Sequence, residues 1–463
     1  MEMSHDTVLN LVNTLSGYVG IALIFALVGT GVYFTIRLNF VQIRKFRQGM
    51  KLVFGNFTLK GEAAGDKGMS SFQALATTIA AQVGTGNIAG AATAIAAGGP
   101  GAIFWMWVAA FFGMATNYAE ATLAQETRTE IDGQIIGGPV YYIKAAFKGT
   151  FGKVLAAIFS VLCILTIGFV GSMAQMNSMG DSIRNALGVP PIVLGIIMAI
   201  ALYLIYRGGI KNIVAVTEKM VPIMAISYII ISLIVIAMNY QNIIPAFKSI
   251  FVGAFFPDSV MGGALGITVR QAIQYGVQRG LFSNEAGVGT TPHAHALAKV
   301  RHSCDQGTVA IITVFIDTFI VLNMTALVIL TTGVFDGTTT GMTLAQNGFN
   351  HAFGALGPIL VFICLFFFAF STLLGTYFFG AQNVKYLFGM KAIPTYRIIV
   401  CILIVLGSTL SVNLMWALND LFNSLMAFPN LLGCIGLSAL VIKKSQEHDK
   451  LPKFDSVNAE KKG

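Results

Sequence analysis

Long apolar segments without charge are the feature that most limits what this chain can fold into. Residues 8–35, 318–335 and 358–384 contain no Asp, Glu, Lys or Arg. A helix of about 20 apolar residues crosses the hydrocarbon core of a membrane, whereas strands of a membrane barrel alternate apolar and polar residues over about 10 positions. The three segments do not alternate. They predict an all-α protein that crosses a membrane several times.

The composition agrees with membrane insertion. Of the 463 residues, 55% are hydrophobic and 11% are charged, and the mean hydropathy is +0.75. A soluble domain has about 25% charged residues, so this chain has too few charges to cover a water-facing surface. The five cysteines show no metal-ligand spacing, and we expect neither a disulfide framework nor a bound cofactor.

The hydropathy pattern predicts eleven transmembrane helices. The predicted spans are 9–36, 70–97, 100–126, 152–179, 190–207, 211–239, 262–297, 307–334, 356–384, 396–416 and 419–443. When successive loops are assigned to alternate sides, one side has nearly all the loop Lys and Arg, and the other has only Arg184 and Lys248. Because basic loops stay in the cytoplasm, we predict a plasma-membrane protein with its N-terminus outside and its C-terminus inside.

The same charge bias explains the net charge of +9 without a nucleic-acid partner. The basic, amphipathic segment 41–57 belongs to the cytoplasmic side in this assignment. It is either a helix along the membrane surface or a solvated loop.

The second predicted span contains the stretch "AQVGTGNIAGA" at residues 81–91. Its glycine spacing, without a preceding strand, does not fit a dinucleotide-binding loop. Close helix packing through Gly86 and Gly90 is an alternative, but it leaves the polar side chains of the stretch unexplained. We favour a helix that unwinds near residues 82–86, because irregular backbone within a membrane survives where it lines a cavity or binds a ligand. The freed carbonyls would suit a cation and the freed N–H groups a carboxylate.

A second interrupted helix is expected in the other half of the chain, because transporters with inverted repeats pair such breaks. Span 262–297 is the least apolar span and has four glycines between residues 276 and 289. A loop outside the membrane is the alternative, but it would spoil the charge asymmetry of the later loops. The predicted organisation is an extra N-terminal helix and cytoplasmic linker (1–69), a first five-helix repeat (70–239), an extracellular connection (240–261), a second repeat (262–443) and a disordered cytoplasmic tail (444–463).

Both interrupted stretches resemble a known family. "TTIAAQVGTGNIAGAATAIAAGGPGAIFWMW" and "GLFSNEAGVGTTPHAHA" are similar to the alanine or glycine:cation symporter family. The resemblance covers roughly residues 19–443. It implies sodium-coupled uptake of alanine or glycine, and the five-plus-five inverted repeat of leucine-type transporters.

The wider fold implies a Na⁺ site between the first broken helix and span 356–384. The resemblance assigns to it the hydroxyls of Ser371 and Thr372 and the carbonyls of Ala80, Val83 and Phe368. Oxygen ligands suit a hard cation. In the alternative interpretation, the two hydroxyls only bond to carbonyls one turn earlier in their own helix.

For the substrate, we expect Gly84, Thr85 and Gly86 to offer N–H groups to the carboxylate. The polar side chains of Thr78, Gln82 and Asn87 are further candidates at the same break. The expected second-helix and wall residues are Gln271, Gln274 and Gly276 for the ammonium group, and Phe169, Tyr275 and Phe367 for closing a small pocket.

Three further sites have polar side chains at membrane depth. Asp317 is expected to bind a second cation or a proton, with Asn87 or Arg270 as its partner; a structural pair is the alternative. Glu285 is expected to join a gate-side polar network with Arg279. His293 and His295 are two residues apart, a spacing that does not favour a metal site on a helix.

These features predict a secondary symporter rather than an enzyme. Proton coupling is an alternative to sodium coupling, and an ion channel is a less favoured one, because a channel needs a ring of pore-lining groups. No phosphate loop or nucleophile–base pair is recognisable in the sequence. The pattern does not distinguish alanine from glycine.

Overall fold

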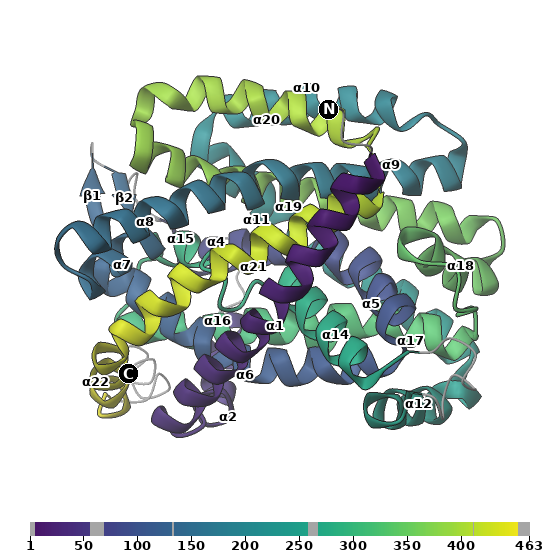
Figure 1. Cartoon of the computed structure of the whole chain (residues 1–463), viewed down its shortest axis with the longest axis horizontal. Helices are drawn as coiled ribbons and strands as arrows, with labels where there is room; N and C mark the ends of the chain where they lie inside the picture. Colours follow the sequence, from purple (N-terminus) through teal and green to yellow (C-terminus); the bar gives the residue numbers. More distant parts are fainter. Residues whose placement is uncertain (1–4, 56–68, 132–133, 258–266, 411, 452–463) are drawn as a thin grey trace, which may run out of the picture.

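The computed structural model describes residues 5–55, 69–131, 134–257, 267–410 and 412–451 (Figure 1). Most predicted spans overlap its helices, but the boundary between the last two is wrong, because α20 ends at Gly407 and α21 already begins at Val412. The continuous helices are α1 (His5–Arg37), α6 (Gly101–Thr127), α10 (Pro191–Arg207), α11 (Gly209–Met238), α19 (Leu356–Phe388), α20 (Ile393–Gly407) and α21 (Val412–Gly436). Within the described ranges, seven helices are long and apolar enough to cross a membrane. The bent pair α21 and α22 would be an eighth.

Two long helices widen by a π-helical segment in their middle. The first consists of α8 (Gly149–Cys163), η2 (Ile164–Gly171) and α9 (Ser172–Leu187). The second consists of α16 (Ser303–Val314), η4 (Phe315–Leu322) and α17 (Asn323–Thr332). Such bulges are frequent at functional sites, and η4 contains Asp317.

Two other helices are interrupted. The first consists of α4 (Ser71–Gln82), η1 (Gly86–Gly90) and α5 (Ala91–Gly98), and the second of α14 (Val269–Asn284) and α15 (Pro292–His295). Capping boxes at Ser70 and Thr268 fix where α4 and α14 begin. α4 is buried from Ala74 to Gln82, because it lies between α11, α16 and α19 in the middle of the bundle.

Short elements connect the long helices. They are α2 (Val41–Arg44), α3 (Phe46–Phe54), β1 (Thr129–Ile131), β2 (Gln134–Ile136), α7 (Pro139–Ala146), η3 (Tyr240–Asn242), α12 (Ile243–Phe255), α18 (Gly341–Phe353), η5 (Met390–Ala392) and α22 (Ser438–Asp449). β1 and β2 form one antiparallel hairpin, the only sheet among the described residues. The all-α prediction otherwise agrees with the fold.

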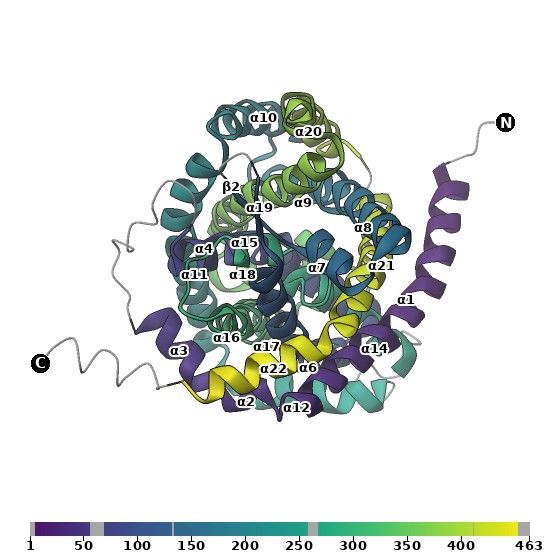
Figure 2. The same ribbon diagram turned by 90° about the vertical axis from the view of Figure 1, so that its left-hand side faces the viewer.

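α10 and α20 pack side by side at one edge of the bundle, as Figures 1 and 2 both show. Their outward faces consist of large aliphatic side chains such as Ile200 and Ile402, which are 60% and 54% exposed. Exposed aliphatic faces of this kind are normal for helices that contact lipid, because lipid chains are as apolar as the side chains.

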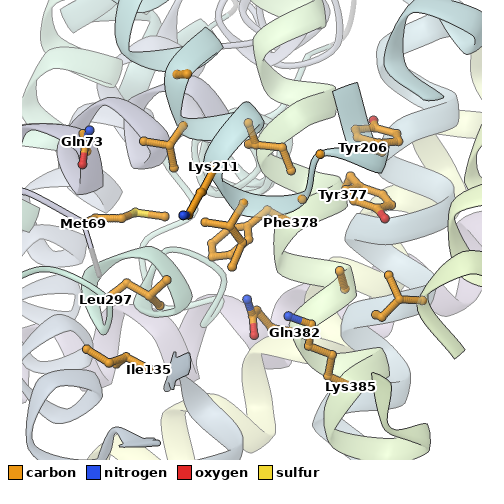
Figure 3. Close-up of a pocket in the computed structure, with 18 of the residues that line it drawn as sticks. Met69, Gln73, Ile135, Tyr206, Lys211, Leu297, Tyr377, Phe378, Gln382 and Lys385 are labelled. Atoms are coloured by element: carbon orange, nitrogen blue, oxygen red, sulfur yellow. The ribbon is translucent and has the colours of Figure 1, made fainter. Parts of the chain in front are cut away.

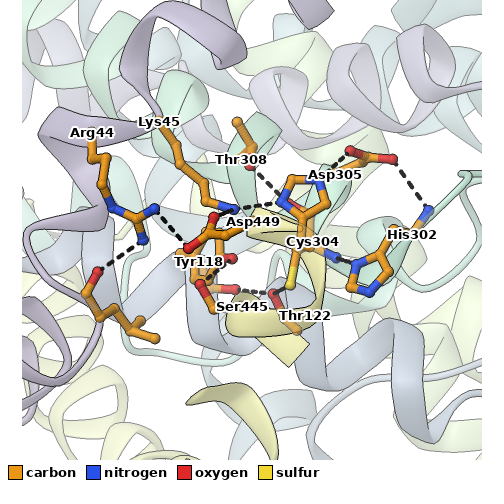
Figure 4. Close-up of polar contacts among 12 residues, drawn as sticks. Arg44, Lys45, Tyr118, Thr122, His302, Cys304, Asp305, Thr308, Ser445 and Asp449 are labelled. Atoms are coloured by element: carbon orange, nitrogen blue, oxygen red, sulfur yellow. Dashed lines mark hydrogen bonds and ion pairs between the residues drawn. The ribbon is translucent and has the colours of Figure 1, made fainter. Parts of the chain in front are cut away.

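Residues 444–449 of the predicted disordered tail are helical in the structure. Helix α22 continues to Asp449, and both Ser445 and His448 are buried against neighbouring helices. The polar composition after residue 443 hid this helix, because its polar groups find partners on α2, α6 and α16 (Figure 4). Residues 452–463 of the predicted tail lie outside the described residues.

The amphipathic segment 41–57 is helical up to Phe54, as α2 and α3. Gly49 and Phe46 of α3 lie against Ile312 and Phe315 in the α16–η4 region, and the rings of Phe46 and Phe315 are 4.8 Å apart. Helix α12 lies in the predicted connection 240–261, of which residues 258–261 are outside the described part.

Candidate functional site

The first helix break frees two backbone carbonyls. In a continuous helix the N–H of residue 84 would bond the carbonyl of Ala80, and the N–H of residue 87 would bond that of Val83. Instead, Gly84 donates to the Asn87 side chain (2.9 Å), and Asn87 donates to the Gly84 carbonyl (3.2 Å). Val83 is extended (φ −79°, ψ 95°). The carbonyls of Ala80 and Val83 therefore lie at mid-helix without their usual partners.

Two hydroxyls of α19 face these carbonyls. Thr372 Oγ1 lies 3.0 Å from the Ala80 oxygen, 3.3 Å from the Val83 oxygen and 2.9 Å from the Phe368 oxygen. Ser371 Oγ lies 2.9 Å from the Phe368 oxygen and 3.5 Å from the Ala80 oxygen. The five oxygen atoms that the sequence analysis assigned to a cation site thus lie together. Both hydroxyls also donate to the Phe368 carbonyl, one turn earlier in their own helix.

The N–H groups of the break point at side-chain oxygens. Gly84 N–H bonds Asn87 Oδ1, and Thr85 N–H donates to Gln175 Oε1 of α9 at 3.0 Å. These two amide oxygens satisfy the N–H groups freed by the break. Gly86 lies against Phe282 and Ser283 of α14, where a Cβ atom would be 3.0–3.1 Å from them.

The second break extends from Glu285 to Thr291. Glu285 ends α14 in the left-handed region (φ 54°), and Gly287 and Gly289 both have φ 88°. Glu120 of α6 accepts from the Gly287 N–H at 3.2 Å and also from the side chain of Asn430 on α21. Asn430 in turn donates to the Gly287 carbonyl at 2.9 Å. One carboxylate and one amide therefore satisfy both polar groups of Gly287.

The two breaks touch each other. Gln82, the last residue of α4, donates from Nε2 to the carbonyl of Asn284, the last residue of α14, at 2.6 Å. The Oε1 atom of Gln82 and the hydroxyl of Thr85 are buried without a hydrogen-bond partner among the described residues. At the junction of the two breaks, these two atoms are therefore available to form hydrogen bonds with a ligand.

Asp317 joins the two broken helices. Its carboxylate accepts from Asn87 Nδ2 (2.6 Å), from Ser283 Oγ (2.9 and 3.1 Å) and from Thr318 Oγ1 (3.0 Å). Of the two partners that the sequence offered, Asn87 and Arg270, Asn87 bonds the carboxylate. Arg270 is exposed near the start of α14 and is not among these contacts.

A cavity of about 630 Å³ is lined by residues of α4, α11, α19 and α20 (Figure 3). Two residues on its wall lie near the first break. Gln73 of α4 is seven residues before Ala80, and Tyr377 of α19 is five residues after Thr372. At 1.5 Å per residue these positions are about 10 Å and 8 Å from the carbonyl–hydroxyl cluster along their helices. Lys211, near the start of α11, and Lys385, near the end of α19, also line the cavity.

A buried ion pair joins α14 to α21 on the side of the second break away from the cavity. Arg279 of α14 bonds Asp420 of α21 at 2.6 Å, and both side chains are buried. The Arg279 guanidinium also lies 4.5 Å from the ring centre of Trp416, which packs against Phe282. The structure does not bring Glu285 into the expected network with Arg279: Glu285 accepts from Thr290 of the break at 2.6 Å, whereas Arg279 pairs with Asp420.

The structure does not bring every expected site residue to the breaks. Gln271 caps the start of α14 with Thr268, and Gln274 and Tyr275 are half-buried on the same helix, nine or more residues before the break. Gly276 instead provides close packing, because a Cβ atom there would lie 2.5 Å from the Ala102 carbonyl oxygen.

Three more expected residues have other surroundings. Phe367 is 37% exposed and packs against Phe366 of its own helix. Phe169 packs against Tyr396 on α20. Thr78 is buried, and its hydroxyl donates to Ala74 one turn earlier at 2.8 Å.

Sequence reasoning missed Gln175, Glu120 and Asn430. Each is a polar residue inside an apolar span, which is the only signal the sequence offers for them. His293 and His295 are buried and bond Thr290 and Gln306. Within the described ranges no cluster of His, Cys, Asp or Glu could hold a metal ion.

Comparison with known proteins gives a family match over nearly the whole chain. The model of the "Sodium:alanine symporter family" matches residues 2–461. The chain is 41% identical to the "Sodium/alanine symporter AgcS" of Methanococcus maripaludis, over 97% of this chain and 99% of that protein. It is 37% identical to the "Amino-acid carrier protein AlsT" of Bacillus subtilis, over 95% and 92% of the two chains.

A solved structure supports the fold. The crystal structure of MhsT in complex with L-phenylalanine aligns with a TM-score of 0.56 over 82% of this chain and 98% of that chain, at 14% sequence identity. The fold match, the full-length family match and the two adjoining helix breaks agree with one another. The chain is a multi-pass membrane protein that belongs to the sodium:alanine symporter family.

Proposed function

We propose that the protein is a sodium-coupled symporter that imports alanine or glycine across the plasma membrane by alternating access. The observation that carries the proposal is the meeting of the freed carbonyls of Ala80 and Val83 with the hydroxyls of Ser371 and Thr372. The names of the relatives, a sodium/alanine symporter and an amino-acid carrier, support the same class of substrate and ion.

In this proposal Na⁺ binds among five oxygens. The carbonyls are those of Ala80, Val83 and Phe368, and the hydroxyls are those of Ser371 and Thr372. Hard cations prefer oxygen ligands, and two of the carbonyls have lost their helical N–H partners. Sodium binding would replace the hydroxyl–carbonyl bonds that now link Thr372 to α4 by shared coordination of one ion, which would tie α4 to α19.

The substrate carboxylate binds at the N–H groups of Gly84 and Thr85. It would displace the amide oxygens of Asn87 and Gln175, which hold these donors now. The buried Oε1 of Gln82 and the hydroxyl of Thr85 offer polar contacts beside the carboxylate. Because Gly84 and Gly86 lie tightly against Thr372 and Phe282, the room at the break favours a small side chain.

Asp317 is proposed to bind a second cation or a proton. Its carboxylate is buried and bonded to neutral donors from both broken helices. A buried charge without a compensating cation is costly, so cation binding or protonation would stabilise this site. Proton coupling through Asp317 is the second candidate mechanism.

We further propose eleven transmembrane helices arranged as two five-helix repeats, 70–239 and 262–443, after an extra N-terminal helix. The two interrupted helices and the short α10 would add three spans to the seven long apolar helices and the bent pair α21–α22, which gives eleven. Each repeat then begins with its broken helix. The loop charges support an external N-terminus and a cytoplasmic C-terminus.

Uptake into liposomes tests the function. We expect labelled alanine to accumulate saturably in proteoliposomes under an inward Na⁺ gradient, and unlabelled glycine to compete. A proton gradient that replaces the Na⁺ gradient with full activity would support the proton mechanism through Asp317. Unsaturable flux independent of both gradients would contradict the symporter proposal.

A variant series tests the cation site itself. The double variant Ser371→Ala/Thr372→Ala should raise the Na⁺ concentration for half-maximal uptake at least tenfold. Thr376→Ala is the matched control, because this buried hydroxyl lies one turn further along α19 and donates to the Leu373 carbonyl of its own helix at 3.2 Å. Unchanged Na⁺ dependence in the double variant would show that the site is elsewhere.

A further inference from the structure

An apolar groove of about 460 Å³ runs along the outer surface of the protein between α10 and α20. Ile196, Ile200 and Leu204 line it from α10, and Ile398, Ile402 and Val405 line it from α20. Figure 2 shows these two helices at the outer edge of the bundle. The groove therefore opens toward the lipid and away from the two helix breaks.

The length of the groove matches one half of a membrane. From Ile196 to Leu204 the α10 wall rises by eight residues, about 12 Å at 1.5 Å per residue. One leaflet of the hydrocarbon core is about 15 Å thick. A single acyl chain lying along the groove would thus remain within one leaflet.

Two arginines flank one end of the groove. The guanidinium carbon of Arg397 lies 5.9 Å from the ring centre of Tyr203, which also lines the groove. Arg207 follows Tyr203 by four residues, so it lies on the same face of α10, and it is exposed. The Nε atom of Arg397 is buried and has no hydrogen-bond partner in the part of the chain that the structure describes.

The charged end is the one that faces the basic loops. Arg207 is the last residue of α10, and Arg397 is in the first turns of α20, next to loops 208–210 and 385–395. These loops are on the side that the charge pattern assigns to the cytoplasm. The groove is thus apolar along its length and cationic at its cytoplasmic end.

We propose that this groove binds an anionic phospholipid of the cytoplasmic leaflet. One acyl chain lies along Ile196, Ile200 and Leu204, and the phosphate lies between Arg207 and Arg397. Basic pockets between transmembrane helices on the cytoplasmic side are suited to anionic headgroups. Because Arg397 also lines the large cavity, the headgroup would lie beside the wall of the cytoplasmic cavity.

A second copy of the chain is a poorer occupant. Most homodimers have a two-fold axis that brings the same patch of both subunits together. In a membrane this arrangement would place the arginine end of one groove against the arginine end of the other. Like charges at such an interface repel, whereas a phosphate attracts both arginines.

Native mass spectrometry of the delipidated full-length protein tests the proposal. Phosphatidylglycerol and phosphatidylcholine with identical acyl chains are titrated separately. We expect tighter binding of phosphatidylglycerol, with about a fivefold contribution from each arginine near the headgroup region. The variant Arg207→Gln/Arg397→Gln should therefore lose roughly 25-fold in phosphatidylglycerol affinity and its preference for that lipid.

A matched control and a groove variant make the test specific. Arg37→Gln removes an arginine that also lies over a tyrosine, Tyr33, at 6.0 Å, but on α1 and outside the groove. It should keep the preference. Cys401→Phe fills the groove and leaves both arginines, so it should weaken binding of both lipids.

Either of two results would overturn the proposal. One is equal affinity of the unaltered protein for the two lipids, or a preference that persists in the arginine double variant. The other is a dimer whose formation excludes phosphatidylglycerol, because it would assign the groove to a second copy. If the double variant does not fold, the Cys401→Phe titration still tests the groove: unchanged binding of both lipids would overturn the proposal.

Discussion

At the scale of single residues, Gly84 determines how closely α4 and α19 approach. A Cβ atom at this position would lie 2.5 Å from Thr372 Oγ1 and 3.2 Å from Gln175 Oε1. Both neighbours belong to the proposed ion and substrate sites. The glycine is therefore required by the site, and not only by the helix break.

We expect Gly84→Ala to weaken Na⁺ activation of alanine uptake at least tenfold, because the added methyl group displaces the Thr372 hydroxyl. Gly90→Ala is the control, since its Cβ would have only Trp416 nearby, at 3.7 Å, and Ala is favoured over Gly in a helix by about 1 kcal/mol. The Na⁺ concentration for half-maximal uptake measures the effect. Similar behaviour of the two variants would contradict the proposed contact.

Glu120 has a structural role at the same scale. It accepts hydrogen bonds from the Gly287 N–H and from Asn430, and both donors are buried. Unpaired buried polar groups cost about 1–3 kcal/mol each. Glu120→Ala should thus lower the free energy of unfolding by about 2–6 kcal/mol, measured by denaturation in detergent.

Glu126→Ala is the control for this experiment. It lies on the same helix, and its carboxylate is 3.4 Å from Lys444 at a more exposed position. Exposed ion pairs contribute about 0–1 kcal/mol. Equal destabilisation by the two variants would mean that Glu120 does not specifically support the second break.

At the scale of elements, α14 and α21 are held together on one side of the site by Arg279 and Asp420. The large cavity lies on the other side, against α4, α11 and α19. A site that is open toward one side and closed on the other by an ion pair is suited to alternating access. We therefore expect the ion pair to form part of an outer gate.

Breaking this pair should open the outer side. Removing one partner of a buried ion pair costs about 3–5 kcal/mol, because the other charge is left uncompensated. In Asp420→Asn we expect several-fold faster labelling of an introduced Ser283→Cys by an impermeant maleimide added outside. Arg184→Gln, which breaks the exposed pair with Asp181, should leave labelling unchanged. Unchanged labelling in Asp420→Asn would exclude the gate.

At the scale of the whole molecule, helix α22 joins parts of the chain that are far apart in sequence (Figure 4). Asp449 bonds Arg44 at 2.7 Å and Lys45 at 2.8 Å, and His448 bonds Asp305 at 2.9 Å. Lys45 also contacts the His448 ring. The C-terminal helix thereby ties α2 to α16 at one end of the bundle.

Asp449→Ala should lower the free energy of unfolding by about 1–3 kcal/mol, because it leaves the buried Lys45 without its carboxylate. Asp181→Ala is the control, since its partner Arg184 is exposed and such pairs contribute about 0–1 kcal/mol. Chemical denaturation in detergent measures both. A smaller effect of Asp449→Ala than of Asp181→Ala would show that α22 is only loosely attached.

The sequence alone determined the membrane insertion, the helical class and the position of the first break. These follow from local properties of the sequence. A charge-free apolar run of sufficient length crosses the membrane as a helix, and a polar glycine-rich stretch does not remain a lipid-facing helix. The five oxygens of the proposed Na⁺ site were expected through family resemblance, and they do lie together. The local sequence pattern therefore predicted which segments cross the membrane and where one of them is interrupted.

Only the tertiary structure decided which distant polar groups meet. Gln175, Glu120 and Asn430 are single polar residues in apolar spans, and nothing in the spacing shows which break they face. The same limit explains why the sequence did not show that Arg279 pairs with Asp420 or that Gln271 caps the start of α14. Contacts between helices depend on how each helix is rotated and packed, and that is set by the whole bundle rather than by neighbours in the sequence.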